Sequence, residues 1–554
     1  MTLTPDRTAT HEVTNQAPPL VGHDLADDPV LVAALAREGG AHALDALHAY
    51  GRNLGTEQVQ TWARQANENP PVLLTHDRYG HRIDEVEFHP AWHELMRLTI
   101  GAGLAGAPWA DTRPAPHVVR AAGFYLDGQV ESGHDCPVSM TYAIVPALRH
   151  NAELAARYEP LLVSTTYDAG LRPRTDKVGL VAGMGMTEKQ GGSDVRANTT
   201  TATDRGDGTY ALRGHKWFTS APMSDVFLML AQAPGGLSCF LVPRVLDDGT
   251  RNVLRLQRLK DKLGNRSNAS SEIELDGTVG FLVGPEGRGV RTIIEMVNHT
   301  RLDCMIGAAA IQRAALVQAV HHARHRRAFG SLLVDQPAMT SVLADLAIES
   351  EAATVLMMRV AGAVDRSAQG DPREAAFKRL ATAVGKFWVT KRSTVMVGEA
   401  LECLGGNGYV EESGLPRLYR EAPLNSIWEG SGNVNALDVL RALARDPESW
   451  SVVREELGAT RGADPAYDAA LADLDTRVAM VAGDPGSAAA VARRVVERMA
   501  LLLQASLLLE HAPPEVADLF CATRLGAEGG MVFGTLPPRG TRAHRTIVER
   551  VLPA

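Results

Sequence analysis

The sequence predicts an α+β fold that is mainly α, because the spacing of its apolar residues changes twice along the chain. Helical spacing runs from about residue 28 to 175, short strands between turn residues fill about 180 to 285, and long helical segments follow. We therefore expect four parts in the 554 residues: an N-terminal arm and α-helical domain at 1–180, a small antiparallel β domain at 181–285, a four-helix bundle at 286–445 and an extra C-terminal helical domain at 446–554.

The first part opens with an arm that is rich in proline, threonine and asparagine. We expect Asn15-Gln-Ala-Pro-Pro-Leu20 to be extended, because residues that precede proline avoid the helical region. Such an arm is either disordered or packed on a neighbouring subunit. After it, Asp28-Pro29 and Gly39-Gly40 bracket a short helix in the way that cap residues do. Further on, one apolar stripe at helical spacing contains Val118, Ala122, Leu126 and Val130.

The second part contains short strands. The runs Thr199 to Thr203 and Tyr210 to Arg213 flank the turn Asp204-Arg-Gly-Asp-Gly208, which predicts a hairpin. Three more short runs between turn clusters are expected to be strands: 226–230, 238–242 and 272–275. A small antiparallel barrel or sandwich accommodates strands of this number and length.

Long helices return in the third part. Four segments at 288–327, 336–366, 373–403 and 433–444 are joined by short connections, which favours an antiparallel four-helix bundle. The last 109 residues continue as helix and include a stretch rich in glycine and proline at 526–540.

The composition restricts the class of protein. The hydrophobic fraction of 45% and the charged fraction of 22% are ordinary for a globular protein, and the net charge of −9 argues against a wholly basic nucleic-acid coat. The five cysteines are far apart and show no CxxC spacing, which predicts a reducing compartment without a disulfide framework or a zinc site. The N-terminus is polar and no run approaches 18 apolar residues, so we expect a cytoplasmic protein without a membrane span.

One motif places a single acidic side chain beside a large aromatic: Ser426-Ile-Trp-Glu429-Gly-Ser-Gly-Asn433. Trp428 would exclude water from Glu429 and raise the carboxylate pKa, as a general acid or base requires. The Gly430-Ser431-Gly432 run lets the backbone approach a bulky ligand closely. The alternative is that this segment is only the N-terminal cap of a helix.

A glycine-rich loop precedes the strands. Within Met184 to Asp194, the hydroxyls of Thr187 and Ser193 and the N–H groups of Gly191-Gly192 can bond a ring edge or a phosphate. The spacing does not fit the dinucleotide motif GxGxxG. The alternative is a turn between domains.

A strand after the hairpin carries Trp217 and Thr219. Residues two apart in a strand point the same way, so a planar cofactor could stack on Trp217 and bond to Thr219. The alternative is an ordinary strand with a buried tryptophan.

The segment His321 to Gly330 is the basic end of a helix. Arg326 could bind a diphosphate while Phe329 packs against an adenine or a flavin. The alternative is a solvated face whose cations complement the helix dipole. Arginines surround the three histidines and no carboxylate is near in sequence, so we expect no metal site here.

In this order, the motifs resemble those of the acyl-CoA dehydrogenase family. The family's M-T-E-x-x-x-G-S-D, W-x-T, R-x-x-F-G, G-G-x-G-[YF] and [YW]-E-G-[ST] motifs match Met186–Asp194, Trp217–Thr219, Arg326–Gly330, Gly405–Tyr409 and Trp428–Ser431. Other features resemble one subgroup, the alkylation-response (AidB-type) flavoproteins: Lys260–Ala269, Pro416–Glu421, the Asn15-Gln arm and the extra C-terminal domain. That subgroup is associated with FAD, weak acyl-CoA dehydrogenase activity, binding of double-stranded DNA and protection against alkylation.

The resemblance implies a role for each matched residue. Glu429 would be the general base that removes the α-proton of an acyl thioester, while a hydride passes to flavin N5. Some family members place the base just before the arginine of the long helix, but here Thr300 precedes Arg301 and cannot serve. The FAD would be held by Met184, Met186, Thr187, Gly192, Ser193, Trp217, Phe218, Thr219, Ser220, Arg326, Phe329, Gln336, Gly405, Gly406, Ile427, Trp428, Gly430, Ser431 and Asn433.

The resemblance also implies an assembly and leaves the function open between two candidates. Arg326 and Phe329 would reach the FAD of a neighbouring subunit, which implies a homotetramer built as a dimer of dimers. The protein is expected to be an FAD-dependent dehydrogenase acting on a short acyl-CoA or a related substrate. The alternative is a DNA-binding protective flavoprotein with little turnover. A third possibility, a scaffold with a dead site, is disfavoured by the intact Glu429, Trp217 and Thr219.

Positive charge is the signal expected of a DNA-binding surface. Residues 446–554 contain 11 Arg and no Lys against 15 Asp and Glu, a net charge of −4, which does not suggest a general polyanion binder. The arginines are nevertheless clustered, and the candidate phosphate contacts are Arg441, Arg493, Arg494, Arg498, Arg539, Arg542 and Arg545. The alternative is a solvated helix face.

Overall fold

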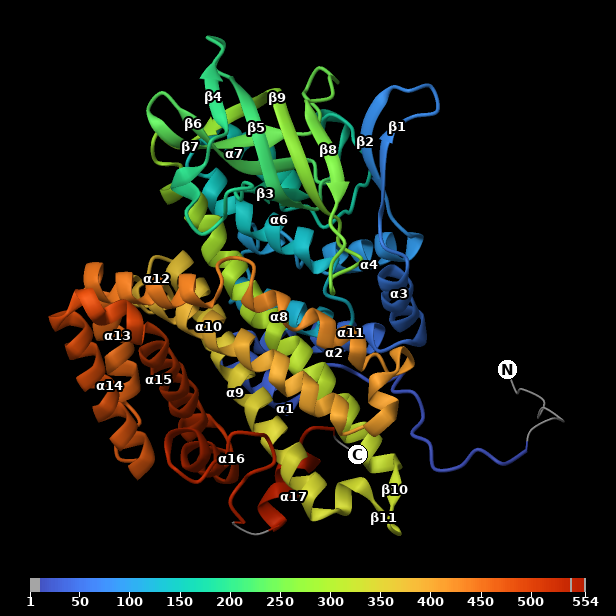
Figure 1. The fold of residues 1–554 in the computed structure, drawn as a ribbon, viewed down its shortest axis with the longest axis vertical. Helices are drawn as coiled ribbons and strands as arrows, with labels where there is room; N and C mark the ends of the chain where they lie inside the picture. The colour runs from blue at the N-terminus through green and yellow to red at the C-terminus, as the bar shows by residue number, and fades with distance from the viewer. Residues whose placement is uncertain (1–9, 539–540, 553–554) are drawn as a thin grey trace.

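The computed structural model of the chain describes residues 10–538 and 541–552. Figure 1 shows a β domain at one end of the molecule, long bundle helices beneath it and C-terminal helices packed along the side and the opposite end. This is the mainly helical α+β architecture that the sequence predicts.

The N-terminal part contains seven helices and one hairpin. The helices are α1 (Pro29–Arg37), α2 (Leu44–Leu54), α3 (Glu57–Glu68), α4 (Pro90–Gly101), α5 (Pro116–Asp127), α6 (Asp135–Leu148) and α7 (Ala152–Leu162). The antiparallel hairpin of β1 (Val72–His76) and β2 (Arg82–Glu87) interrupts a region that we expected to be entirely helical. Its strands are short and largely exposed, so they lack the buried alternation that marks a strand in sequence.

The β domain is a small barrel built from β3 (Ala182–Gly185), β4 (Thr201–Asp204), β5 (Tyr210–Ser220), β6 (Val226–Ala233), β7 (Gly236–Pro243), β8 (Leu254–Leu259) and β9 (Ser270–Val283). The strand order is β3-β6-β4-β5-β9-β7, and pairing of β6 with β7 closes the ring. The pairs are antiparallel except where β6 meets β3 and β4. The predicted β4–β5 hairpin and the three further strands are confirmed, whereas β3 and β8 were not anticipated.

The bundle consists of α8 (Gly289–His325), α9 (Pro337–Ala368), α10 (Pro372–Glu402) and α12 (Gly432–Arg445), each within two residues of its predicted bounds. The short helix α11 (Leu415–Glu421) lies in the connection from α10 to α12. The C-terminal part adds α13 (Pro447–Gly458), α14 (Pro465–Gly483), α15 (Pro485–His511), α16 (Pro514–Phe520) and α17 (Thr541–Glu549). None of the helices in the described ranges has the length and hydropathy needed to cross a membrane.

An Asp-Pro pair starts five of these helices. In each pair the aspartate side chain accepts hydrogen bonds from backbone N–H groups of the first turn, and the proline occupies a first-turn position where its missing N–H costs nothing. The five capping residues are Asp28, Asp371, Asp446, Asp464 and Asp484.

Three apolar cores organise the molecule. The largest runs without a break through N-terminal, bundle and C-terminal helices, so the division of the helical parts near residues 180 and 445 stays a prediction. A second core lies between α6, α7 and one face of the barrel, and a third fills the barrel interior. The second core matters for function, because the β domain meets the bundle there.

Candidate active site

Glu429 lies in a turn just before α12, in a left-handed backbone conformation with φ of +56°. Residues other than glycine rarely adopt this conformation, and it persists only where the surroundings hold it. Lys386 Nζ donates to the carbonyls of Trp428 (2.9 Å) and Gly430 (2.5 Å). Arg301 Nε donates to the carbonyl of Glu429 itself (3.0 Å). Three consecutive carbonyls are therefore bound by cations from α10 and α8.

The Glu429 carboxylate faces α8, where the Thr300 hydroxyl donates to its Oε2 at 2.7 Å. Burial raises the pKa of Glu429, while the Thr300 hydrogen bond and the charges of Lys386 and Arg301 oppose this rise. The neighbouring Trp428 packs on the second core and donates its indole N–H to Asn425 Oδ1 at 3.0 Å. The arrangement gives the acid/base environment that the motif predicts.

The alternative interpretation of this motif was a helix cap, and the geometry does not support it. Ser431 occupies the N-cap position of α12, but its side chain makes no capping hydrogen bond. Ser431, Asn433 and Ile427 are instead exposed beside Glu429. The buried amide that supports the turn is Asn435, whose Nδ2 donates to the Gly430 carbonyl at 2.5 Å.

A second layer of charge holds Arg301. Asp438 on α12 accepts from Arg301 at 2.8 Å and from Arg379 on α10 at 3.1 Å, so one carboxylate ties three bundle helices together beneath the turn. This network could not be predicted from the sequence, because an arginine in a helical segment is ordinarily a surface residue.

The glycine-rich loop that follows β3 folds back on itself. Trp217 N–H donates to the Thr187 carbonyl at 2.8 Å. A side chain at Gly192 would collide with Thr187, because its Cβ would lie 2.5 Å from the Thr187 hydroxyl oxygen. The loop thus exposes Gly192 and Ser193, while Met184 and Met186 pack on the second core.

A buried ion pair anchors this loop to the barrel. Lys216 Nζ lies 2.8 Å from Glu188 Oε1, and both side chains are inaccessible to solvent. Burial alone would raise the pKa of Glu188, but Lys216 and hydrogen-bond donors from Thr199 and Thr200 lower it overall. This ion pair was not predicted from the sequence. The signal in the sequence that could have revealed the pair is Lys216 itself, a lysine within a strand two residues before the exposed Phe218.

A bulge in β5 corrects one expectation. The pairing of β5 with β9 shifts register between Lys216 and Thr219, and both side chains approach Gly185 on the inner side. Trp217 and Thr219 therefore do not point the same way. Trp217 is half-buried beneath Lys260, whose Nζ lies 3.3 Å from the ring centroid, while Phe218 is half-exposed.

The β5 strand and the base turn converge at α6. Burial raises the pKa of the Cys136 thiol to about 12, and the groups that interact with this thiol include Ser220 at the end of β5 and the Glu429 carboxylate. The Thr219 hydroxyl nearby is buried without a hydrogen-bond partner in the described residues. An unpaired buried hydroxyl, an exposed glycine loop and an acid group around one core fit a flavin.

The remaining predicted cofactor residues lie elsewhere. Arg326 follows α8, and Phe329 forms the fully exposed tip of the small hairpin of β10 (Arg327–Ala328) and β11 (Ser331–Leu332). Gln336 donates to the Ala328 carbonyl at 2.9 Å. About 39 Å of helix, at 1.5 Å per residue, separates Thr300 from Arg326. Figure 1 shows the hairpin at the opposite end from the barrel.

Gly405 and Gly406 begin a short 3-10 helix (Gly405–Tyr409) directly after α10 and are exposed, as is Tyr409. Lys386 stands 16 residues, or about 24 Å of helix, before the end of α10. Within one chain, the predicted cofactor residues of the β domain therefore lie far from the second set, which comprises Arg326, Phe329, Gln336, Gly405 and Gly406.

The N-terminal arm packs on the exposed hairpin of its own chain. The Asn15 amide exchanges two hydrogen bonds with the backbone of Arg327, at 2.9 and 2.7 Å, and the Asn15 carbonyl accepts from the Arg326 side chain at 2.5 Å. His321 bonds the Pro18 carbonyl at 2.8 Å. The arm is therefore ordered over this stretch, and contact with a neighbouring subunit stays a prediction.

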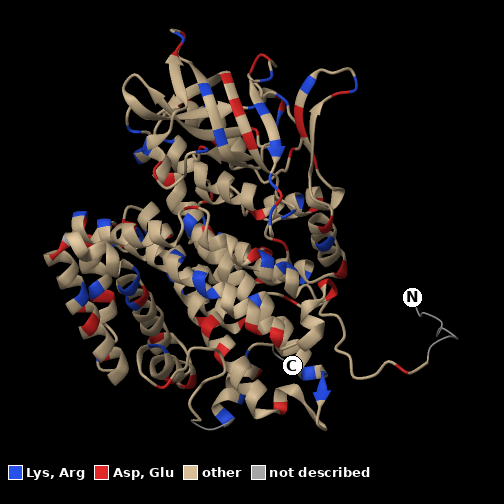
Figure 2. Ribbon diagram, in the orientation of Figure 1, with Lys and Arg blue, Asp and Glu red and all other residues tan. Residues whose placement is uncertain are grey.

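The arginines proposed for DNA contact fall into two separate groups. Arg493, Arg494 and Arg498 lie on α15, which packs beside α12, the helix of Arg441; Arg542 and Arg545 lie on α17, which packs against α9. Arg539 lies outside the described residues. Figure 2 shows both acidic and basic residues on the C-terminal helices. Three of the arginines have acidic partners: Arg441 with Asp438, Arg498 with Asp473, and Arg545 with Asp335 and Glu549.

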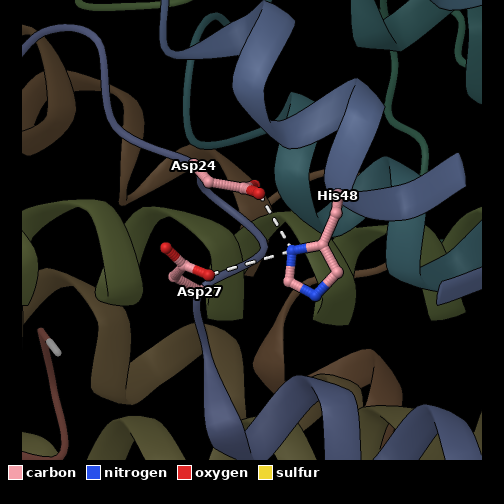
Figure 3. Close-up of side chains that lie close together, drawn as sticks. All are labelled: Asp24, Asp27 and His48. Carbon is pink, nitrogen blue, oxygen red and sulfur yellow. Dashed lines mark hydrogen bonds and ion pairs between the residues drawn. The ribbon is translucent and has the colours of Figure 1, made fainter. Parts of the chain in front are cut away.

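Two histidine–carboxylate clusters in the described residues have the composition of metal sites, but in each the histidine is hydrogen-bonded to a neighbouring carboxylate. In Figure 3, His48 Nδ1 lies 2.9 Å from Asp24 and 3.8 Å from Asp27, and Arg52 donates to the same Asp24 carboxylate. In the buried cluster, His134 bonds Asp127 through Nε2 and Glu131 through Nδ1.

The His134 cluster is an ion-pair network. Burial would lower the pKa of His134, but the adjacent carboxylates raise it well above its ordinary value. An imidazolium has no lone pair to offer a metal.

Comparisons place these features in a known family. Residues 15–169 match the N-terminal domain of the adaptive response protein AidB, residues 183–278 match the acyl-CoA dehydrogenase middle domain and residues 287–444 match the acyl-CoA dehydrogenase C-terminal domain. The chain is 46% identical over 528 residues to the putative acyl-CoA dehydrogenase AidB of Escherichia coli (strain K12), covering 94% of this chain and 96% of the relative.

Two further comparisons agree. The chain is 31% identical to acyl-CoA dehydrogenase family member 11 of Caenorhabditis elegans, over 90% of this chain and 85% of the relative. The crystal structure of Caenorhabditis elegans ACDH-11 in complex with C11-CoA matches with a TM-score of 0.86 over 100% of both chains, at 28% identity. The chain therefore belongs to the acyl-CoA dehydrogenase family of FAD-dependent oxidoreductases, in its AidB-type group.

Proposed function

We propose that this protein oxidises a short acyl-CoA, or a related thioester, with Glu429 as the base that removes the α-proton. The observation that carries the proposal is the carboxylate itself: it is held in a left-handed turn, its pKa is raised by burial, and it is oriented by the hydrogen bond from Thr300. FAD, when bound, accepts the hydride from the β-carbon.

The two carboxylate oxygens of Glu429 have different surroundings. Oε2 accepts the Thr300 hydrogen bond, whereas Oε1 receives none from the described residues and can take the substrate proton. A raised pKa strengthens the carboxylate as a base. Thr300 thus orients the base without exchanging a proton with substrate.

The turn also offers a hydrogen-bond donor. The carbonyls of residues 428–430 are engaged by Lys386 and Arg301, whereas the Glu429 N–H has no acceptor in the part of the chain that the structure describes. Such an N–H can bind the thioester carbonyl and stabilise the negative charge that develops when the α-proton leaves.

The residues proposed to hold FAD come from two copies of the chain. Thr187, Ser193, Trp217 and Thr219 of one copy would bind the ring and the adjoining phosphates. Arg326, Phe329, Gln336, Gly405 and Gly406 of another copy would complete the site, because they lie too far away to act in the same chain. This separation supports an oligomer in which two copies complete each site; the homotetramer, a dimer of dimers, is the assembly we propose.

The experiment is anaerobic titration of the purified yellow protein with acyl-CoA esters from butanoyl to dodecanoyl. A range of chain lengths is required because the similar Caenorhabditis elegans structure is a complex with C11-CoA. We expect at least one ester to bleach the visible flavin absorbance, and Glu429→Gln to keep the colour but lose the bleaching. Equal bleaching of parent and variant would remove Glu429 from its role.

A second candidate function, binding of duplex DNA in a protective role, rests on Arg493 and Arg494, which are exposed side by side on α15. Phosphate contacts of this kind weaken steeply with salt. We expect affinity to fall between about 50 and 200 mM salt, and Arg493→Gln with Arg494→Gln to reduce the salt slope by about two. Affinity that is independent of salt and of both arginines would contradict this proposal.

A further inference from the structure

We propose that Lys386 is a positioning residue for proton abstraction, which acts through the main chain of the base turn without touching substrate. The inference rests on the proposed role of Glu429. Its evidence is that Lys386 Nζ bridges the carbonyls of Trp428 and Gly430, the residues on either side of Glu429.

Lys386 differs from the other buried lysines, because no carboxylate pairs with its ammonium in the described residues. Three lysines are buried in the described residues, and two of them are in ion pairs: Lys177 with Asp225 and Lys216 with Glu188. Lys386, only 1% exposed, is the one of these three without a carboxylate within ion-pair distance in the described chain. Burial of an unpaired ammonium is costly. The groups that repay this cost are the two turn carbonyls.

The turn requires such support because Glu429 is not a glycine. With φ of +56°, its backbone is held in a conformation that would relax without external contacts. Lys386 binds the peptide plane that precedes Glu429 and the plane that follows Gly430, and Arg301 binds the plane between Glu429 and Gly430. Without the ammonium, rotation of the plane that precedes Glu429 would move the carboxylate away from Thr300 and out of line with the α-proton.

Titration of Lys386 should be visible in the pH dependence of flavin reduction. Burial lowers the pKa of Lys386 to about 8; the Cys304 thiol and Glu429 oppose this shift, while Arg301 and Lys391 add to it. Lys386 therefore loses its charge as pH rises through about 8, and its hold on the carbonyls weakens. The rate of flavin reduction should rise with pH as Glu429 ionises and fall again above about pH 8.

The test compares variants of the FAD-loaded protein in single-turnover reduction by the ester that bleaches the parent best. Lys386→Met should retain FAD and bind the ester within about threefold of the parent, yet be reduced roughly 100-fold more slowly, because small misplacements of a base cost this much. The matched control is Lys177→Met, which removes another buried lysine that bonds a carbonyl, that of Gly170. It should melt earlier but be reduced at the parental rate.

Lys386→Arg provides a second arm that does not depend on the fate of Lys386→Met. Its charge persists at every accessible pH, so the fall in rate above about pH 8 should disappear. Parental reduction rates in Lys386→Met, or an unchanged alkaline fall in Lys386→Arg, would overturn the inference. If Glu429→Gln is inactive while the Lys386 variants behave as the parent, only this inference fails. If Glu429→Gln is itself fully active, the proposed function fails.

Discussion

The Thr300 hydroxyl donates a 2.7 Å hydrogen bond to the Glu429 carboxylate, joining two positions 129 residues apart. Thr300 directly precedes Arg301 on α8, the place where some members of the family carry their base. The two alternative base positions are therefore neighbours in space. In this chain Thr300, at the position that does not carry the base, supports Glu429 through this hydrogen bond.

Replacing Thr300 by valine keeps the shape and removes the hydrogen bond. This bond lowers the pKa of Glu429, so its loss should raise that pKa further and shift the acid limb of the rate profile to higher pH. We expect the rate of flavin reduction to fall roughly tenfold on the acid limb of the profile and less at higher pH, where Glu429 is ionised. Stopped-flow reduction across this range measures the shift. An acid limb that stays in place would show that the hydroxyl does not act on the carboxylate.

Glu429→Gln should make the fold more stable at neutral pH. The folded-state pKa of Glu429 is raised above 4.5, so its contribution to stability is present below that pH and is lost as pH rises through the folded pKa. Glutamine carries no such cost. The melting temperature of the variant should exceed that of the parent by more at pH 8 than at pH 5. A constant difference would mean that the carboxylate is not destabilised by burial.

Asp438→Asn should destabilise the bundle by about 3 kcal/mol, because it leaves the buried Arg301 without its carboxylate. Urea unfolding measures this loss. The matched control is Asp475→Asn, which breaks the more exposed pair with Arg454 and should cost less than about 1 kcal/mol. Similar losses in both variants would show that Asp438 is an ordinary surface partner.

Phe329→Ala should leave the folded chain intact, because the ring is fully exposed and packs on none of the residues that the structure describes. If a second copy uses this ring at its cofactor, FAD should bind at least tenfold more weakly and the tetramer should dissociate more readily. Apparent FAD affinity and light-scattering mass report both effects. Tyr79→Ala removes another exposed aromatic, on the β1–β2 hairpin, and serves as control. Parental behaviour of Phe329→Ala would argue against a shared site.

Local signals in the sequence were sufficient to predict the helices of the bundle and their bounds. Helix α10 begins at Pro372, one residue from the predicted start at 373, because the capping Asp371 and the first-turn proline act within four residues. The exposed β1–β2 hairpin was missed, because strands without a buried face carry no alternation. Trp217 and Thr219 were assigned to one face, which is wrong, since a bulge between Lys216 and Thr219 is set by pairing with β9.

The role of Glu429 as the base could be proposed from its motif, but the residues that hold its turn could not be predicted from the sequence. Lys386, Arg301 and Asp438 meet the turn or one another across separations of between 42 and 137 residues. Each of the three, taken alone in a helical segment, is a typical surface residue. Only the packing of α8, α10 and α12 turns these separate charges into one network.

The role of Glu429 is decided by single-turnover reduction of the parent and Glu429→Gln by the best acyl-CoA ester, with FAD content matched. We expect that the parent flavin bleaches and that the variant binds the ester with similar affinity but stays yellow. A variant that bleaches at the parental rate would contradict it, because the α-proton would then leave without the carboxylate on which the site is built.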